Sequence, residues 1–150
     1  MPLIGREKVD AMIQKEYTGL NNKVRGVFFK GGYNIIIETP VDEGRTRANW
    51  FFEVGAPSTK TTKSKNDFAG IRNLNKMPSF IFNKKLFISN NMPNIIPLEY
   101  GGYPDPVKKG TWNKKKKKYE VRSSGGFSKQ APNGWVRIML IRMRNAIRKL

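Results

Sequence analysis

Residues 39–50 read Thr-Pro-Val-Asp-Glu-Gly-Arg-Thr-Arg-Ala-Asn-Trp, and this stretch decides how the chain folds. Pro40 ends the element before it, because its ring removes a backbone donor and holds Thr39 in an extended conformation. Asp42 is a residue type that caps the next turn, and Gly44 adopts a backbone angle that other residues avoid. The stretch therefore predicts a rigid corner between a helix and a strand.

The segment before the corner carries helical spacing. Apolar side chains recur four apart between residues 6 and 17, and Gly19 then predicts a helix stop. Residues 20–37 repeat the spacing, which predicts a second helix. The alternative is a β-hairpin that turns at Gly31-Gly32, because β-branched residues follow and two glycines cost a helix about 2 kcal/mol relative to alanine. The residues alone leave both readings open.

Strand and loop signals alternate after the corner. Residues 49–56 predict a strand with one apolar face, and residues 57–67 predict an exposed loop rich in Ser, Thr and Lys. Residues 68–77 predict a short helix that Pro78 ends. Residues 80–89 predict either one long strand or two strands separated by a tight turn.

The C-terminal third contains a long polar hairpin or loop followed by a final helix. Residues 90–93 have turn chemistry, and residues 95–100 predict a short edge segment or a helical turn. Residues 101–126 predict a protruding hairpin or loop whose tip carries a lysine run, Lys114, Lys115, Lys116, Lys117 and Lys118. Residues 132–135 open the last helix, whose predicted apolar stripe is Val136, Met139, Leu140, Met143, Ala146, Ile147 and Leu150.

The composition is strongly basic. Lys and Arg total 29 against 11 acidic residues, a formal charge of +18, which attracts polyanions or acidic protein surfaces. The chain has no cysteine and no histidine, so thiolate metal sites and the commonest general base are excluded. No apolar run approaches the roughly 20 residues of a membrane span, and residues 1–8 lack a signal peptide's apolar core. We expect a soluble protein made in the cytoplasm, with no membrane partner.

Catalytic patterns are missing from the sequence. There is no phosphate-binding glycine loop, and the serines have no histidine to activate them. A metal-dependent nuclease is the enzyme class most compatible with the charge, but no glutamate is followed two positions later by lysine, as the common nuclease pattern requires. Asp42 and Glu43 are adjacent and would not converge on one ion if extended. We expect no enzymatic activity, no catalytic residue, no cofactor and no metal.

Four motifs, taken in order, resemble a known family. They are residues 39–50, Asn90-Asn91-Met92-Pro93, Leu98-Glu99-Tyr100-Gly101, and Ala131-Pro132-Asn133-Gly134-Trp135-Val136-Arg137. In this order they resemble the neck proteins of tailed phages, the tail-completion and head–tail joining family related to tail terminators. The pattern departs from the family at Arg47, which comes one place early, and at residues 102–127, which are an insertion ahead of Ser128.

The resemblance implies an α+β fold in a single domain over residues 1–150. It implies a small antiparallel β-sheet flanked by N-terminal helices and a C-terminal helix, with residues 102–127 as a long lysine-rich hairpin or loop insertion. It also favours the helical reading of residues 20–37.

The resemblance further implies a structural role in the virion, at the head–tail junction. Such proteins join the tail to the head connector or end the tail tube, as a ring around the DNA channel. The expected partners are other copies of the chain, as a hexamer, the head connector or head-closure protein, and the tail-tube or tail-terminator protein. Ring closure requires a head-to-tail interface, so an isolated subunit is expected to expose an apolar edge or patch.

The motif residues are the candidates for the subunit interface. Arg45 and Arg47 either pair with acidic neighbours or face a subunit boundary. Glu99, if half-buried, needs a cation, for which Arg45, Arg47 and Arg137 are candidates, and an intersubunit salt bridge is the sharper hypothesis. Tyr100 is expected to pack at the rim of the core. The full set is Pro40, Asp42, Gly44, Arg45, Arg47, Trp50, Asn91, Pro93, Glu99, Tyr100, Gly101, Pro132, Gly134 and Arg137.

The lysine run supports an alternative function. Trp112 and Tyr119 flank Lys114–Lys118, and this pattern of basic and aromatic residues is also found in proteins that bind single-stranded nucleic acid. The plainer reading is a solvated loop. Trp50 and Trp135 are expected in the core, whereas Trp112 is expected to be exposed or to meet DNA or a partner protein. Nucleic-acid binding, if present, is expected to be independent of sequence and sensitive to salt.

Overall fold

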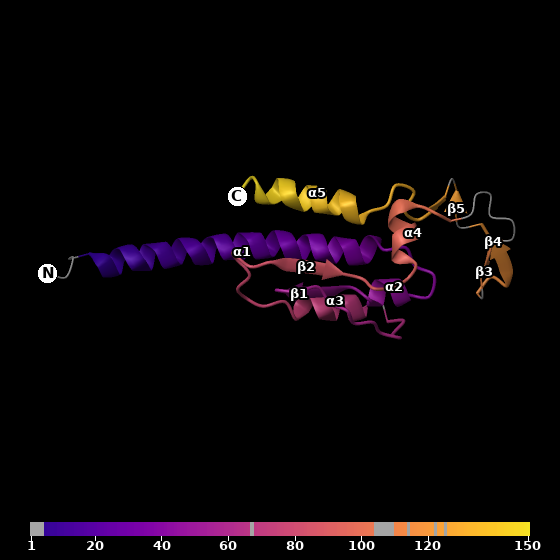
Figure 1. Cartoon of the computed structure of the whole chain (residues 1–150), viewed down its shortest axis with the longest axis horizontal. Coiled ribbons are helices and arrows are strands. Elements are labelled where there is room, and N and C mark those ends of the chain that lie inside the picture. Colours follow the sequence, from indigo (N-terminus) through magenta and orange to yellow (C-terminus); the bar gives the residue numbers. More distant parts are fainter. Residues whose placement is uncertain (1–4, 67, 104–109, 114, 122, 125) are drawn as a thin grey trace.

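The computed structural model describes residues 5–66, 68–103, 110–113, 115–121, 123–124 and 126–150. Its dominant element is α1, Arg6–Glu38, a helix of 33 residues that spans about 50 Å at the usual rise. The N-terminal end of α1 projects beyond the rest of the molecule, while its C-terminal half is covered by other elements (Figure 1). The helical reading of residues 20–37 is thus correct.

Gly19 does not end a helix, contrary to the prediction, because α1 continues through it without a break. Two later glycines explain why a helix rather than a hairpin forms. A Cβ at Gly31 would collide with the Met143 side chain, and one at Gly32 would lie 2.7 Å from the Phe52 ring. The glycines therefore let other elements approach the helix closely, and this packing outweighs their low helix propensity.

The predicted corner connects α1 to the first strand. It contains a single helical turn, α2, Arg45–Ala48, and leads into β1, Phe51–Val54. Gly44 precedes α2 with φ 86°, in the left-handed region that favours glycine. The expected cap by Asp42 is wrong, because Gly44 is the N-cap residue and no side chain caps the turn.

Six short strands form antiparallel pairs in the described part of the chain. β1 pairs with β2, Leu86–Ser89, with Phe51 opposite Ser89. β3, Thr111–Asn113, pairs with β4, Lys118–Glu120. β5, Ser123–Ser124, pairs with β6, Phe127–Ser128. The chain is α+β as expected, with small antiparallel sheets.

Three further helices complete the fold. α3, Phe68–Asn75, corresponds to the predicted short helix. α4, Ile95–Tyr100, is a helix, which was one of the two alternatives predicted for residues 95–100. α5, Val136–Ile147, packs on the C-terminal half of α1. Of the residues 80–89 that were expected to form one or two strands, only Leu86–Ser89 do so, as β2. The backbone N–H groups of Ile81 and Phe82 instead donate to the side chain of Asn21.

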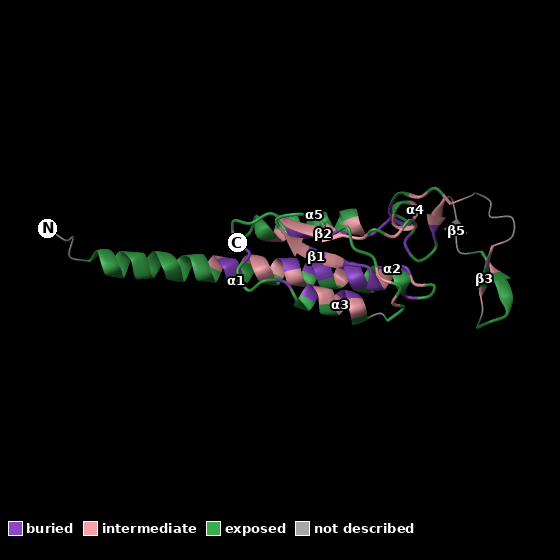
Figure 2. Ribbon diagram, turned by 60° about the horizontal axis from the view of Figure 1, so that its bottom comes forward, coloured by how far each residue is buried: buried purple, intermediate pink, exposed green. Residues whose placement is uncertain are grey.

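The core lies between α1, the β1–β2 sheet and α5. Trp50 and Trp135 are each 3% exposed and meet edge to face, with ring centroids 6.5 Å apart. Phe28 and Phe52 meet in the same way at 6.3 Å. Both tryptophans are therefore core residues, as predicted. Figure 2 shows the buried residues concentrated in this region and the projecting end of α1 exposed throughout.

Candidate functional site

The Leu-Glu-Tyr-Gly and Ala-Pro-Asn-Gly-Trp-Val-Arg motifs meet at the carboxylate of Glu99, which is 5% exposed. Its Oε2 accepts hydrogen bonds from the backbone N–H groups of Trp135 and Val136, at 2.8 and 2.9 Å. Its Oε1 accepts from the backbone N–H of Arg137 at 3.0 Å and from its side-chain Nε at 2.9 Å. A carboxylate from α4 thus satisfies the free donors at the start of α5, where the helix dipole favours negative charge.

These contacts set the protonation of Glu99. Burial by itself raises the pKa of the carboxyl group, because it disfavours the charged form. The hydrogen bonds from the Arg137, Trp135 and Val136 backbones and from the Arg137 side chain together outweigh burial, so the pKa is held below its ordinary value. Glu99 is therefore ionised at neutral pH and acts as a structural anchor.

Arg137 is the cation that Glu99 uses, out of the three predicted candidates. The pair lies within one chain, in place of the intersubunit salt bridge predicted from the sequence. The Arg137 guanidinium carbon also lies 4.5 Å from the centroid of the Tyr100 ring, a cation–π contact. Tyr100 itself is 56% exposed, so the expectation that its ring packs at the core rim is wrong.

Gly134 makes this junction sterically feasible. It has φ 70° and is buried, and a Cβ there would fall on the carbonyl oxygen of Glu99. Gly101 ends α4 with φ 80° and donates its N–H to Pro97 O at 3.0 Å. Pro132 is exposed and forms a bridge with Gly134. The glycines of both motifs thus serve the junction between α4 and α5.

The corner is held by Arg47 and Thr39. Nη2 of Arg47 donates to the carbonyl oxygens of Ile37 and Thr39, at 2.7 and 3.1 Å, and so satisfies acceptors at the end of α1. The Thr39 hydroxyl donates to Ile35 O at 2.7 Å and accepts from Trp50 Nε1 at 2.8 Å. Pro40 is buried beside them. Through these two bonds Arg47 ties α2 to the C-terminal end of α1.

Arg45 behaves differently. It is exposed, and its Nε lies 3.8 Å from Glu43 Oε2, as the pairing with an acidic neighbour predicted. Such exposed pairs contribute little to stability. Arg45 thus remains on the surface beside the corner.

The Asn-Asn-Met-Pro motif ties the corner to the loop at residues 57–66. Asn91 Nδ2 donates to the carbonyl oxygens of Ser58 and Lys60, at 2.8 and 2.9 Å. Asn90 Nδ2 donates to Thr46 O at 2.9 Å, on α2. Pro93 is exposed in the turn before α4. The loop is largely exposed, as predicted, but it is held by these amides.

Sequence reasoning missed three other polar anchors. Gln130 exchanges two hydrogen bonds with the backbone of Val41, at 2.9 and 3.0 Å, and so joins the corner to the segment before α5. Asn49 exchanges two with the backbone of Thr62, at 2.7 and 2.9 Å. Asn21 binds the backbone at residues 79–82. Only Asn21 carried a signal, because it lies seven positions before Phe28 and so on a core-facing side of α1.

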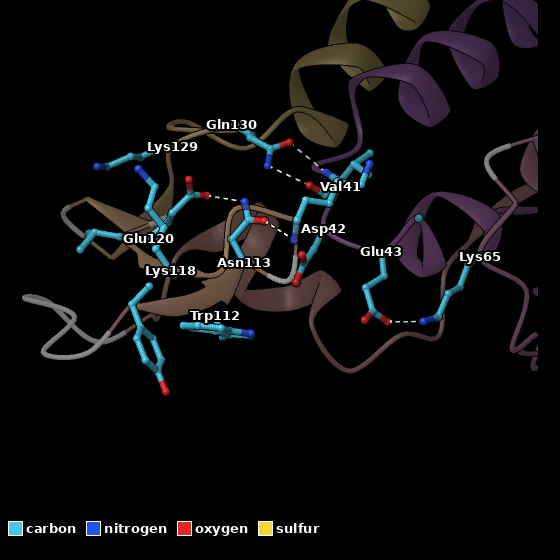
Figure 3. A pocket seen from close by; sticks show the side chains of 14 residues that line it. Val41, Asp42, Glu43, Lys65, Trp112, Asn113, Lys118, Glu120, Lys129 and Gln130 are labelled. Carbon is cyan, nitrogen blue, oxygen red and sulfur yellow. Dashed lines mark hydrogen bonds and ion pairs between the residues drawn. The ribbon is translucent and has the colours of Figure 1, made fainter.

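A cleft of about 920 Å³ lies between the corner and the β3–β4 hairpin (Figure 3). One wall is Val41–Gly44 with Lys65, and the other includes Trp112, Lys118 and Tyr119. Lys65 Nζ lies 2.8 Å from Glu43 Oε2. The rings of Trp112 and Tyr119 meet at 5.1 Å and are 46% and 64% exposed, so Trp112 is exposed as predicted. Asp42 also lines the cleft.

The structure describes four of the five lysines of the run. Lys115, Lys116 and Lys117 form the turn between β3 and β4, and Lys118 begins β4, while Lys114 lies outside the described residues. Lys116 Nζ lies 2.8 Å from Glu120 Oε1, and Asn113 Nδ2 donates to Glu120 Oε2 at 2.8 Å. The described lysines of the run are exposed.

Two helix surfaces leave apolar side chains uncovered. Residues 6–17 of α1, called here the projecting end, are exposed throughout and carry Val9 (55% exposed), Met12 (68%) and Ile13 (45%). On α5 only Met139 and Met143 of the predicted stripe are buried. The large apolar residues of α5 and of the chain end after it that are exposed are Ile138, Leu140, Ile141, Ile147 and Leu150.

The described residues lack two other types of site. They contain no group of three or more metal-binding side chains placed to hold an ion, and none of their helices has the length and apolar character needed to cross a bilayer. Compared with protein-family models, with curated proteins and with solved structures, the chain matches none.

Proposed function

We propose that this chain is a structural subunit of a tailed-phage neck. In this role it joins the tail to the head connector, or ends the tail tube, as one member of a ring around the DNA channel. The observation that carries the proposal is the uncovered apolar surface of the projecting end of α1 and of α5. Exposed apolar side chains that gather on one surface mark a site where a protein meets a partner.

The use of the motif residues supports a mechanical role. Three motif side chains, Glu99, Asn91 and Arg47, form hydrogen bonds to backbone atoms of neighbouring segments. Such bonds fix the relative positions of α1, α4 and α5. A subunit held together in this way contacts its neighbours as a rigid body, which suits a ring that bears mechanical force.

The expected ring is a hexamer, with the head connector or head-closure protein on one side and the tail-tube or tail-terminator protein on the other. The charge of +18 favours acidic surfaces on those partners and contact with the genomic DNA in the channel. The protein acts without catalysis, cofactor or metal.

The experiment is quantitative mass spectrometry of purified particles of the phage that encodes the chain. The proposal predicts a fixed, small number of copies per particle, and particles with unjoined heads and tails when the gene is deleted. Detection only in the infected-cell lysate, with normal particles from the deletion, would contradict it.

A second candidate function is sequence-independent binding of nucleic acid. The observation that favours it is the cleft, which is lined by Lys65, Lys115, Lys118 and Lys129 and by the exposed rings of Trp112 and Tyr119. Lysines bind the phosphate backbone and aromatic rings stack on bases. This function predicts tight binding near physiological salt, whereas a neck subunit needs none.

A further inference from the structure

One face of α1 is apolar along most of its length, yet only part of it is covered. The face begins at Val9 and Ile13 and continues at helical spacing through Leu20, Val24 and Gly31. At Gly31 it is covered by α5, whose Met143 side chain occupies the space that a Cβ would take. The projecting end therefore displays, without a cover, the same face that a short helix covers further along α1.

The uncovered part of this face contains two charged residues, Arg6 and Glu16, and Arg6 forms an ion pair with Asp10. Glu16 lies seven positions after Val9 and four before Leu20, so it is within the apolar stripe. A helix that covered the stripe would have to supply a cation for Glu16, because a buried carboxylate without a partner is costly. The projecting end as a whole is balanced in charge, with Arg6, Lys8 and Lys15 against Glu7, Asp10 and Glu16.

The outer face of α5 has the complementary pattern. Leu140 and Ile147 are 46% and 41% exposed, and Arg144 lies between them, four positions after the first and three before the second. Arg144 therefore interrupts the apolar stripe, and Arg137, seven positions before it on the same line of the helix, is already paired with Glu99. The lengths also agree, because α5 has 12 residues and residues 6–17 cover the same distance, about 18 Å.

The two surfaces cannot meet within one molecule. The projecting end points away from α5 and beyond the end of the body (Figures 1 and 2). A contact between them therefore joins one copy to the next and leaves the joined pair with one free projecting end and one free α5 face. Such a head-to-tail contact builds a ring when its rotation closes.

We propose that the projecting end of α1 of one copy docks on the outer face of α5 of the next copy, with Glu16 against Arg144. This inference rests on the proposed ring function and names the interface that builds the ring. The docking covers Val9, Met12 and Ile13 with the side chains of Leu140, Ile147 and their neighbours.

Charge reversal tests this contact in the full-length chain. Glu16→Arg places two cations together and Arg144→Glu places two anions together, so each single variant is expected to weaken self-association at least tenfold in sedimentation experiments. The double variant restores an opposite-charge pair and is expected to associate like the wild type. A mixture of the two single variants is also expected to associate, because alternating copies form opposite-charge contacts at every junction.

The control is Glu7→Arg, which makes the same charge change on the same exposed helix segment. Glu7 is two positions from Val9, so it lies on the opposite side of the helix. This variant is expected to associate like the wild type, and circular dichroism is expected to show equal helix content in all variants. Incorporation into particles of a phage that lacks the gene gives a second readout, with the same order of variants.

Wild-type levels of association and incorporation in both single variants would overturn the docking contact. If the wild-type chain is still present as a ring in particles, the proposed function stands and only the interface is wrong. If the wild-type chain is absent from particles, the neck function is wrong, and sedimentation of the purified variants still decides the docking contact.

Discussion

Glu99 and Arg137 lie 38 positions apart in sequence, and one oxygen of Glu99 accepts hydrogen bonds from both the backbone and the side chain of Arg137. The contact places an ionised carboxylate at the first turn of α5, with only 5% of Glu99 exposed. The position of α5 against α1 therefore depends on a residue from α4. The first two predictions concern this junction.

Removal of the Glu99 charge is expected to destabilise the fold. Glu99→Gln keeps the size of the side chain but weakens the bonds to the α5 N-terminus and leaves Arg137 without its anion. We expect the free energy of unfolding to fall by about 2 kcal/mol, the range for hydrogen bonds to charged groups. Urea denaturation measures the change. Glu53→Gln is the matched control, because Glu53 makes only an exposed pair with Lys60, and it is expected to change stability by less than about 0.5 kcal/mol.

The lowered pKa of Glu99 gives a prediction for acid stability. A carboxyl group whose pKa is lower in the folded state binds fewer protons than in the unfolded state, so its contribution is complete above the unfolded pKa of about 4.3. The contribution is lost as the pH falls through the lower folded pKa. The difference in stability between wild type and Glu99→Gln is therefore expected to shrink as the pH falls below about 4. A difference that stays constant down to pH 2 would show that Glu99 acts without its charge.

Gly134 is expected to tolerate no side chain. Gly134→Ala places a β-carbon on the Glu99 carbonyl oxygen and forces alanine to φ 70°, a conformation that costs about 1–2 kcal/mol before the collision is counted. We expect a loss of at least about 2 kcal/mol in the free energy of unfolding. Gly26→Ala is the control, because Gly26 lies within α1 with open space around it, and this change is expected to stabilise by up to about 1 kcal/mol. Equal effects of the two substitutions would contradict this assignment.

The hairpin lysines separate the two candidate functions. Replacement of Lys115, Lys116 and Lys118 by serine is expected to weaken binding to a fluorescent oligonucleotide and to reduce the dependence of its affinity on salt, because fewer phosphate contacts remain. The same variant is expected to enter particles normally if the chain is a neck subunit. Loss of particles together with loss of DNA binding would favour the nucleic-acid function instead.

The sequence predicted those features that local chemistry determines. Pro40 and Gly44 indicated the corner, and helical spacing indicated the last helix, although only Met139 and Met143 of its predicted apolar stripe are buried. The exposed position of Trp112 also followed from its polar surroundings. In each of these cases the decisive residues are close together in the chain.

The features that the sequence did not determine depend on contacts between distant segments. Gly19 looked like a stop, but α1 continues through it. Gly31 and Gly32 looked unfavourable for a helix until Met143 and Phe52 were seen against them. The sequence offers three arginines as partners for Glu99, and only the position of α5 in the fold selects Arg137.

Imaging of the neck of the intact virion at side-chain resolution tests the central claim most directly. The account predicts a closed ring of this chain between capsid and tail, with the first helical turns of each copy against the last helix of its neighbour. A collar built without this chain, or copies that make no contact with one another there, would contradict it.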